Sequence, residues 1–369
     1  MSDDVDLPVA EPLRVALLAD GRCFELFPSV IRRLCVGLID EAVRVVLICD
    51  EAELPPSFPS GPVQHVTYSS GWWTSGRRRA AGVIQQVGGE QPMLVHALSG
   101  RLLGLARRLA AAWQVPAVVQ IAALGELRER QAGGAPSVHF AAPSEPLLDY
   151  IRDASGCPPD RCVLIRPGLH CQTETACLRD SSKMPAIMAP TVQDGGLAYL
   201  VRAFGAVLAA GYQAMLFVLG AGASEGELRR LIGQLGLVQS VTFAGRLPEP
   251  MAAIRGGDLF VLPGKVGQMM ELPLAAMGAG LAMVGASGSV LDFLTHERTA
   301  LLHPERDEAG LTEQLMRLLA DPPFARRLAA QGQAYVREHH TVSAMIRATR
   351  QLYDRITLPQ RTIRIRPSR

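Results

Sequence analysis

The sequence predicts an α/β protein made of two doubly wound domains, each with parallel strands and crossover helices. The chain has 369 residues, which is enough for two domains of about 150 residues each. Short apolar runs alternate with helical patterns along most of the chain, as in parallel sheets. A polar segment without sustained periodicity, residues 171–185, interrupts the alternation and is typical of an interdomain linker.

The first domain is predicted at residues 1–175. Residues 13–20 form a buried apolar run that ends in a turn, and a helix at 30–39 and a second strand at 43–49 follow. Further strands are expected at 93–97, 117–121, 138–142 and 162–166, with a helix at 100–113.

The second domain is predicted at residues 176–345. Its strands are expected at 186–188, 214–220, 241–243, 259–262 and 282–284, and its helices at 197–209, 225–235, 311–319, 323–339 and 342–353. Residues 346–369 are predicted to hold the end of the last helix and a basic, solvated tail after Pro359. Ligands of such folds bind at the carboxyl ends of the strands, so we expect a site in the cleft between the domains.

The composition is that of an ordinary soluble globular protein, with 48% hydrophobic residues, 20% charged residues and a net charge of +2. This charge gives no reason to expect a nucleic-acid partner. The acidic N-terminus lacks the pattern of a signal peptide, and no apolar run reaches the ~18–20 residues that span a bilayer, so a cytoplasmic location is predicted.

The seven cysteines are expected to be reduced thiols. Cys157, Cys162, Cys171 and Cys177 cluster in the sequence beside His170, but they lack the tight C-x-x-C spacing of zinc sites. We therefore expect no metal site.

The most informative motif spans residues 261–280 and reads VLPGKVGQMMELPLAAMGAG. It aligns without gaps to V-L-P-S-x-x-E-G-F-G-x-x-L-L-E-A-M-A-x-G. Residues 241–248 and 258–263 are similar to V-x-F-x-G-x-V-P and A-D-V-F-V-L-P, and residues 95–97 to V-H-A. With these segments, in this order and spacing, the chain resembles the family 4 glycosyltransferases.

The resemblance implies a GT-B fold, in which two Rossmann-like domains face an interdomain cleft. It also implies the transfer of a hexose from a nucleotide diphosphate sugar to a glycan or lipid-linked acceptor, with retention and without a metal. The first domain would then lie on the acceptor side and the second on the nucleotide-sugar side. No cofactor is expected, because the nucleotide sugar is a co-substrate.

The charged donor residues of that family are absent from this chain. The family's arginine and lysine after the first strand of the second domain align with Pro190 and Gly195, and its two glutamates align with Gly267 and Ala275. None of these four side chains carries a charge. The motif keeps the residues that form the fold, whereas it lacks the charged residues that contact the donor in that family.

Nearby residues suggest a replacement donor site. The candidates are Arg246, Lys265, Glu271, Gly288, Ser289 and Asp292. Lys265 is one of only two lysines and lies two residues before the first lost glutamate. Residues 285–290 are rich in glycine and serine, so their backbone amides could cradle a phosphate. The alternative is that these residues are ordinary surface charges and a plain turn.

Two features of the first domain are open to two interpretations. His96 ends an expected strand and is a candidate general base toward an acceptor hydroxyl, or a hydrogen-bonded structural histidine. Trp72 and Trp73 precede Arg77, Arg78 and Arg79, a combination suited to an anionic lipid surface or to an ordinary loop and helix start.

Two hypotheses about function remain. In the first, the protein is a glycosyltransferase with an atypical donor site, cytoplasmic or peripheral at the inner membrane face. In the second, it is a catalytically inactive pseudo-glycosyltransferase that binds a glycan, a nucleotide or a protein partner. The missing charge favours the second hypothesis, since removing one preorganised transition-state donor costs ~10²–10³ in rate. The retained architecture favours the first.

Overall fold

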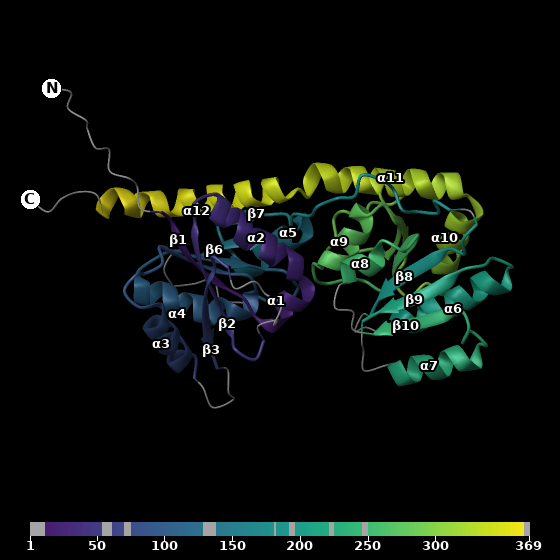
Figure 1. Ribbon diagram of the computed structural model, residues 1–369, viewed down its shortest axis with the longest axis horizontal. Helices are drawn as coiled ribbons and strands as arrows, with labels where there is room; N and C mark the ends of the chain where they lie inside the picture. The colour runs from purple at the N-terminus through teal and green to yellow at the C-terminus, as the bar shows by residue number, and fades with distance from the viewer. Residues whose placement is uncertain are drawn as a thin grey trace, which may run out of the picture. The chain divides into compact units, whose positions relative to one another are not determined.

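The computed structural model describes residues 12–53, 61–69, 75–127, 138–180, 182–191, 196–220, 225–245 and 250–364. The chain folds into two compact units (Figure 1). The first comprises Met1–Ala142, Ile151–Ile165 and Ile346–Arg369, and the second comprises Pro143–Tyr150 and Arg166–Met345. Both units are α/β, as the alternation of strands and helices predicts.

The first unit contains a parallel sheet whose described strands lie in the order β3-β2-β1-β4-β5-β6-β7. The strands are β1 (Arg14–Leu18), β2 (Arg44–Asp50), β3 (Gln64–Tyr68), β4 (Leu94–Ala97), β5 (Ala117–Gln120), β6 (Val138–Ala142) and β7 (Cys162–Leu164). Its helices are α1 (Gly21–Leu26), α2 (Pro28–Asp40), α3 (Gly76–Val87) and α4 (Leu103–Trp113), with the short 3-10 helices η1 (Gly100–Leu102) and η2 (Pro159–Arg161). Helices α5 (Glu145–Ser155) and α12 (Val342–Arg364) contain residues of both units.

The second unit contains a second parallel sheet, with its described strands in the order β10-β9-β8-β11-β12-β13. The strands are β8 (Ala186–Pro190), β9 (Met215–Leu219), β10 (Val241–Gly245), β11 (Leu259–Leu262), β12 (Ala282–Ala286) and β13 (Leu301–His303). The remaining helices are α6 (Gly196–Ala209), α7 (Glu225–Gln234), α8 (Pro250–Ile254), α9 (Glu271–Gly278), α10 (Glu308–Ala320) and α11 (Pro322–His339).

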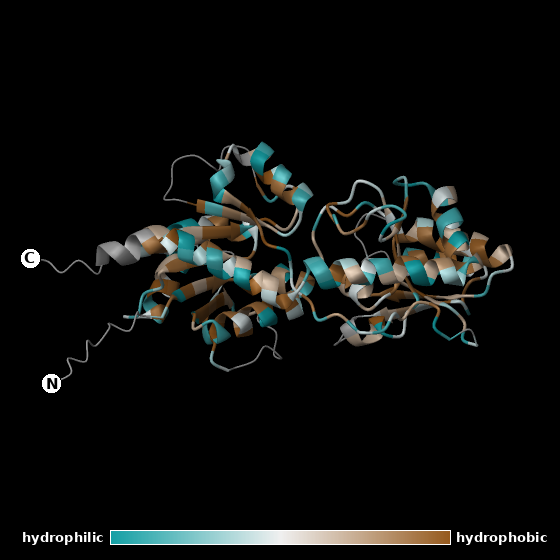
Figure 2. Ribbon diagram, turned by 90° about the horizontal axis from the view of Figure 1, so that it is seen from above, coloured by the Kyte–Doolittle hydropathy of each residue, from teal (hydrophilic) through white to brown (hydrophobic). Residues whose placement is uncertain are grey.

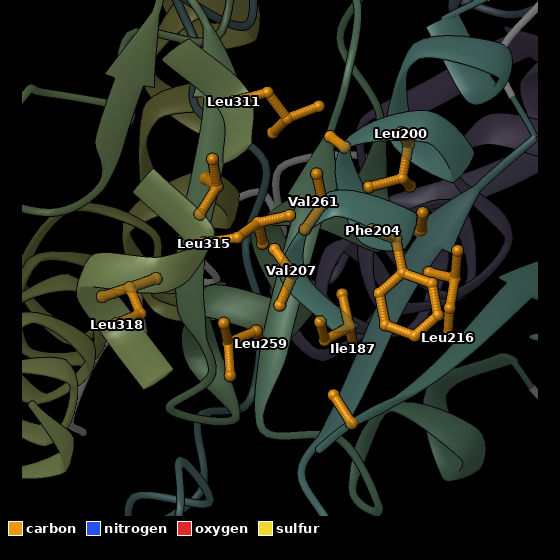
Figure 3. Close-up of a cluster of buried hydrophobic side chains, with 14 of the residues drawn as sticks. Ile187, Leu200, Phe204, Val207, Leu216, Leu259, Val261, Leu311, Leu315 and Leu318 are labelled. Carbon is orange, nitrogen blue, oxygen red and sulfur yellow. The ribbon is translucent and has the colours of Figure 1, made fainter. Parts of the chain in front are cut away.

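Apolar side chains of the second sheet pack against helices α6 and α10 (Figure 3). Phe204 and Val207 of α6 and Leu315 of α10 are fully buried beside the strand residue Val261. Each such side chain stabilises the unit by about 1.5–3 kcal/mol relative to an exposed position. Hydrophobic residues concentrate in the strands, whereas the helices alternate between apolar and polar residues (Figure 2).

The last helix is longer than the sequence predicts. It was expected to end near residue 353 with a tail after Pro359, but α12 continues through Pro359 to Arg364. Two fully buried threonines, Thr349 and Thr357, continue the buried stripe of the helix where the apolar pattern fades. Thr357 Oγ1 donates a 2.8 Å hydrogen bond to the carbonyl of Tyr353, which satisfies its buried hydroxyl. In the described part of the chain, no helix is long and apolar enough to cross a membrane.

Candidate functional site

The carboxyl ends of β8, β11 and β12 lie at one edge of the second sheet, because these strands are parallel neighbours. Three segments leave this edge: the start of α6, the loop 263–270 that leads into α9, and the turn 286–290 after β12. Three of the six sequence-predicted donor residues, Lys265, Gly288 and Ser289, belong to these segments. We call these three segments together the second-unit edge.

The start of α6 lies directly against the loop that follows β11. A Cβ atom built on Gly196 would lie 3.0 Å from the backbone nitrogen of Gly264, so a larger side chain would push the two segments apart. Glycine therefore allows the first turn of α6 to approach the loop. The first N–H groups of a helix lack partners within the helix and favour anions.

The turn after β12 is held by serine hydroxyls. Ser289 Oγ donates to the carbonyl of Ala286 at 3.0 Å and accepts from the backbone N–H of Val266 at 3.0 Å. The N–H of Val290 donates to the carbonyl of Val266 at 2.9 Å. These bonds tie the turn to the loop 263–270 and fix the position from which Lys265 extends.

Lys265 extends over the turn. Its Cε and Nζ atoms lie 3.4 Å and 3.5 Å from the point where a Cβ of Gly288 would be. Gly288 has φ 77, a conformation that favours glycine. The structure thus brings Lys265, Gly288 and Ser289 together, with the cation exposed to solvent.

The positions at which the family carries charged donor residues hold uncharged residues in this chain. Pro190 ends β8 and is buried, Gly267 lies in the loop after β11, and Ala275 is half-buried in α9. Gly195 lies outside the described residues. None of the three described positions offers a carboxylate or a cation to a ligand.

Two further candidates are acidic. Glu271 is the first residue of α9 and only 1% exposed. A carboxylate in the first turn of a helix is favoured by the helix dipole. Asp292 Oδ2 receives a 2.5 Å hydrogen bond from Arg166 Nη1 and a 3.1 Å bond from the N–H of Glu145, at the start of α5. Asp292 therefore acts as an internal anchor for these segments of the second unit. Arg246 lies outside the described residues.

His96 is enclosed in the first unit. The residue is 2% exposed, and its Nδ1 lies 2.6 Å from the hydroxyl of the fully buried Tyr353 in α12. The two rings meet edge to face at a centroid distance of 5.7 Å. Burial lowers the pKa of His96 to about 3, so the ring is neutral at physiological pH. This geometry matches the structural interpretation of His96 rather than contact with an acceptor.

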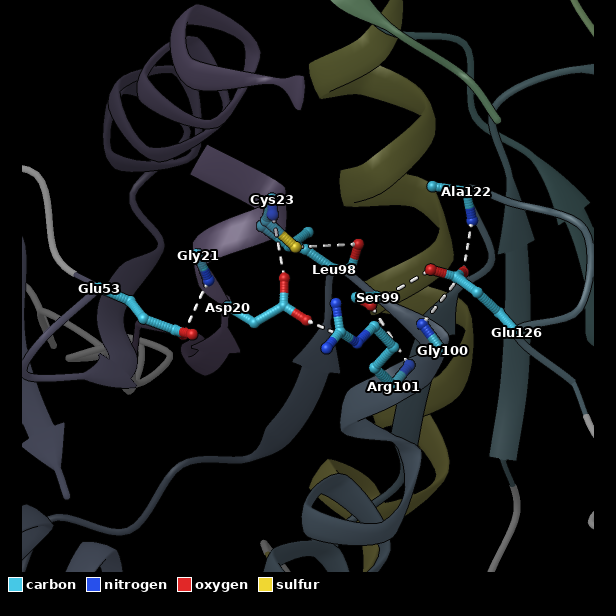
Figure 4. A network of polar contacts seen from close by, with 10 residues as sticks. All are labelled: Asp20, Gly21, Cys23, Glu53, Leu98, Ser99, Gly100, Arg101, Ala122 and Glu126. Carbon is cyan, nitrogen blue, oxygen red and sulfur yellow. Dashed lines mark hydrogen bonds and ion pairs between the residues drawn. The ribbon is translucent and has the colours of Figure 1, made fainter. Parts of the chain in front are cut away.

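A polar network that the sequence did not indicate lies at the carboxyl edge of the first sheet (Figure 4). Asp20 follows β1 and caps α1, where its Oδ1 accepts from the N–H of Cys23 at 2.9 Å. Its other oxygen lies 3.9 Å from Nε of Arg101, whose side chain is 61% exposed. Glu53 Oε2 accepts from the N–H of Gly21 at 2.8 Å.

The same network continues at β4 and β5. Glu126 Oε2 accepts from the N–H groups of Ala122 at 2.9 Å and Gly100 at 3.3 Å, and its Oε1 accepts from Ser99 Oγ at 3.3 Å. Burial raises the pKa of Glu126, while these hydrogen bonds act in the opposite direction. The only available signal was a polar residue shortly after a buried strand, since Asp20 lies two residues after β1 and Ser99 two residues after β4.

The comparisons with known proteins identify one part of the chain. Residues 187–321 match the family described as "Glycosyl transferases group 1". These residues lie within the second unit. A curated relative, a GDP-mannose-dependent monoacylated alpha-(1-6)-phosphatidylinositol monomannoside mannosyltransferase of Corynebacterium glutamicum, is 29% identical over 167 residues. That match covers 42% of this chain and 43% of the relative, so it spans less than half the length of either protein.

Solved structures establish the fold over nearly the whole chain. Sucrose-phosphate synthase from Thermosynechococcus elongatus superposes with a TM-score of 0.75 at 17% identity, covering 94% of this chain and 100% of that one. Anabaena Alr3699/HepE, in complex with UDP and glucose, superposes with a TM-score of 0.75 at 15% identity, covering 93% and 99% of the two chains. The prediction of a GT-B fold with two Rossmann-like domains is confirmed.

Proposed function

We propose that the protein is a glycosyltransferase that transfers a hexose from a nucleotide diphosphate sugar to a glycan or lipid-linked acceptor. The observation that carries this proposal is the position of Lys265 over the Gly288 turn, at the carboxyl edge of a glycosyl transferases group 1 domain. Nucleotides bind at this edge in doubly wound folds. The curated relative is GDP-mannose-dependent and a structural neighbour was solved with UDP, so both support a nucleotide sugar as the donor.

In the proposed mechanism, the ammonium group of Lys265 takes the role of the charged residues that this chain lacks. When the sugar leaves, negative charge develops on the nucleoside diphosphate and needs fixed countercharge. Lys265 would supply it with its ammonium group, and the first N–H groups of α6 would add hydrogen-bond donors. Retention of configuration and the absence of a metal requirement belong to the same proposal.

The alternative is a pseudo-glycosyltransferase that binds a ligand or protein partner without turnover. Gly267 and Ala275 favour it, because neither has a side chain that can accept hydrogen bonds from the sugar or ribose hydroxyls. The two hypotheses differ in one respect that can be measured, namely whether bound nucleotide sugar is consumed.

Calorimetric binding of UDP-, GDP- and ADP-sugars tests the proposed donor site. We expect one nucleotide class to bind, and Lys265→Ala to weaken that binding by about 10- to 100-fold, since hydrogen bonds to charged groups contribute ~1.5–3 kcal/mol. Lys265→Arg should keep most of the affinity, because it retains the charge. Equal affinity of Lys265→Ala and the wild type would remove Lys265 from the site.

The chain offers a matched control. Lys183 is the other lysine of the protein, and its exposed side chain pairs with Asp180 at 3.4 Å in the second unit. Lys183→Ala removes the same charge from the same unit and should leave nucleotide affinity unchanged. If both substitutions weaken binding equally, the effect comes from net charge rather than from the second-unit edge.

A further inference from the structure

Two cysteine thiols meet at the ends of the loop that joins α5 to β7. Cys157 lies two residues after the end of α5, and Cys162 is the first residue of β7. Both belong to the first unit. The thiol of Cys162 shares a hydrogen bond with the thiol of Cys157, although no disulfide joins them in this structure. The fold therefore holds two oxidisable sulfur atoms in contact.

The backbone of the loop keeps these two thiols in place. Gly156 has φ 58, a conformation that favours glycine and lets the chain leave α5 in a tight turn. Pro158 and Pro159 fix the next backbone angles, and the N–H of Cys162 donates to the carbonyl of Pro159. Cys162 is also paired with Phe140 of β6, so the sheet holds it from the other side. The two cysteines are thus positioned by the fold rather than by their sequence spacing alone.

The two thiols differ in exposure and in acidity. Cys157 is half-buried, whereas Cys162 is 8% exposed. Burial raises the pKa of the Cys162 thiol to about 12, the neighbouring Cys157 acts in the same direction, and the charge of Arg152 opposes both. Access to the sulfur governs which thiol a small oxidant meets first. We therefore expect Cys157 to react first and Cys162 to react with the sulfur beside it.

We propose that Cys157 and Cys162 are a site of reversible oxidation, at which a low-molecular-weight disulfide such as oxidised glutathione converts the two thiols to an intramolecular disulfide. Cys157 Sγ loses its proton to solvent and attacks one sulfur of the small disulfide, whose S–S bond breaks. The departing half leaves as a thiolate and takes up a proton. Cys162 Sγ then loses its proton and attacks Cys157 Sγ, which releases the second half as a thiol. Two electrons and two protons pass from the protein to the small disulfide, which is reduced to two thiols.

The bond would restrain a short segment that lies between two passages of the chain from one unit to the other. The chain enters the first unit at Ile151 and leaves it after Ile165. A disulfide between Cys157 and Cys162 would tie the end of α5 to the start of β7 within this segment. A small thiol can reach the bond from the side of Cys157, and exposed disulfides are the ones that exchange readily. The site is therefore suited to a reversible rather than a permanent bond.

Mass spectrometry of the full chain tests this proposal without any nucleotide sugar, so its outcome is independent of the proposed transferase activity. After treatment with oxidised glutathione and alkylation of the remaining thiols, trypsin should release peptides 153–161 and 162–179 joined through Cys157 and Cys162. Dithiothreitol should separate them. The oxidised protein should have lost two of its seven thiols, and its melting temperature should rise by several degrees, because the cross-link restricts the unfolded chain. In urea, the bond should need a ratio of oxidised to reduced glutathione that is about 10-fold higher, since folding no longer holds the thiols together.

Serine variants separate the roles of the two thiols. Cys162→Ser removes the second thiol, so oxidised glutathione should leave one glutathione bound to Cys157. Cys157→Ser removes the exposed thiol, so neither the linked peptides nor an adduct on Cys162 should form. Cys171→Ser is the matched control, because Cys171 is also half-buried but lies in the second unit, and it should leave the linked peptides unchanged. The absence of linked peptides in the wild type, a bond from Cys157 to Cys171, or equal oxidation of the native and the urea-unfolded chain would overturn the proposal.

Discussion

Tyr353→Phe should destabilise the first unit measurably, although it removes a single oxygen atom. Tyr353 is fully buried, and its hydroxyl is 2.6 Å from Nδ1 of a histidine, His96, that is 2% exposed. Phenylalanine keeps the ring and its packing but leaves Nδ1 of His96 without a partner. A buried polar group that loses its partner costs about 1–3 kcal/mol. With an m-value of about 1–3 kcal/mol/M in urea, the midpoint of unfolding should fall by about 1 M.

Tryptophan fluorescence is a selective probe for this prediction, since all three tryptophans, Trp72, Trp73 and Trp113, lie within residues 1–142. Urea unfolding followed at this signal reports on the first unit. Tyr212→Phe is the matched control: Tyr212 is half-buried in the second unit, and its hydroxyl makes no hydrogen bond with any described residue. A Tyr353→Phe midpoint equal to that of the wild type would refute the structural role of the hydrogen bond.

Two further predictions concern pH and the glycine turn. Because burial lowers the pKa of His96 to about 3 from 6.5, the unfolded state binds the proton more tightly, so stability should fall as pH drops below about 6.5. The free energy of unfolding should fall by about 2 kcal/mol between pH 6.5 and pH 5, at about 1.4 kcal/mol per pH unit. Tryptophan-detected urea curves that do not change over this range would contradict the prediction. Gly288→Ala places a side chain at φ 77 against Lys265, so it should cost about 1 kcal/mol in unfolding experiments and weaken nucleotide binding several-fold. Unchanged stability and unchanged affinity together would show that the turn is neither strained nor part of the donor site.

The buried strands were the most predictable part of the fold. Residues 259–262 were expected as a strand and form β11 with the same bounds, because a continuous apolar run between turns has few other solutions in a parallel sheet. Helix α10 begins three residues before its expected start at Leu311. Its first three residues, Glu308 to Gly310, include no large apolar side chain, and Asp307 caps the turn by accepting from the N–H of Gly310 at 2.9 Å. Apolar periodicity does not detect a capped turn of this kind.

The candidate site was predictable only in part. Lys265 and Gly288 follow neighbouring strands, so their proximity could be expected from the order of strands in a doubly wound sheet. The burial of Glu271 and the pairing of Asp292 with Arg166 could not, since both depend on how distant segments pack. The hydrogen bond that Glu126 accepts from the N–H of Gly100 also has no sequence signature, because any residue except proline supplies a backbone donor.

Release of nucleoside diphosphate from a panel of UDP-, GDP- and ADP-sugars is the most direct test of the central claim, that the second unit holds a working donor site built around Lys265. The wild type should release one nucleoside diphosphate, slowly with water as acceptor and faster with a suitable glycan or lipid-linked acceptor. Lys265→Ala should abolish the release, and Lys183→Ala should not change it. Tight binding of a nucleotide sugar without any release would establish the pseudo-glycosyltransferase, and the absence of both binding and release at millimolar donor would contradict the donor site itself.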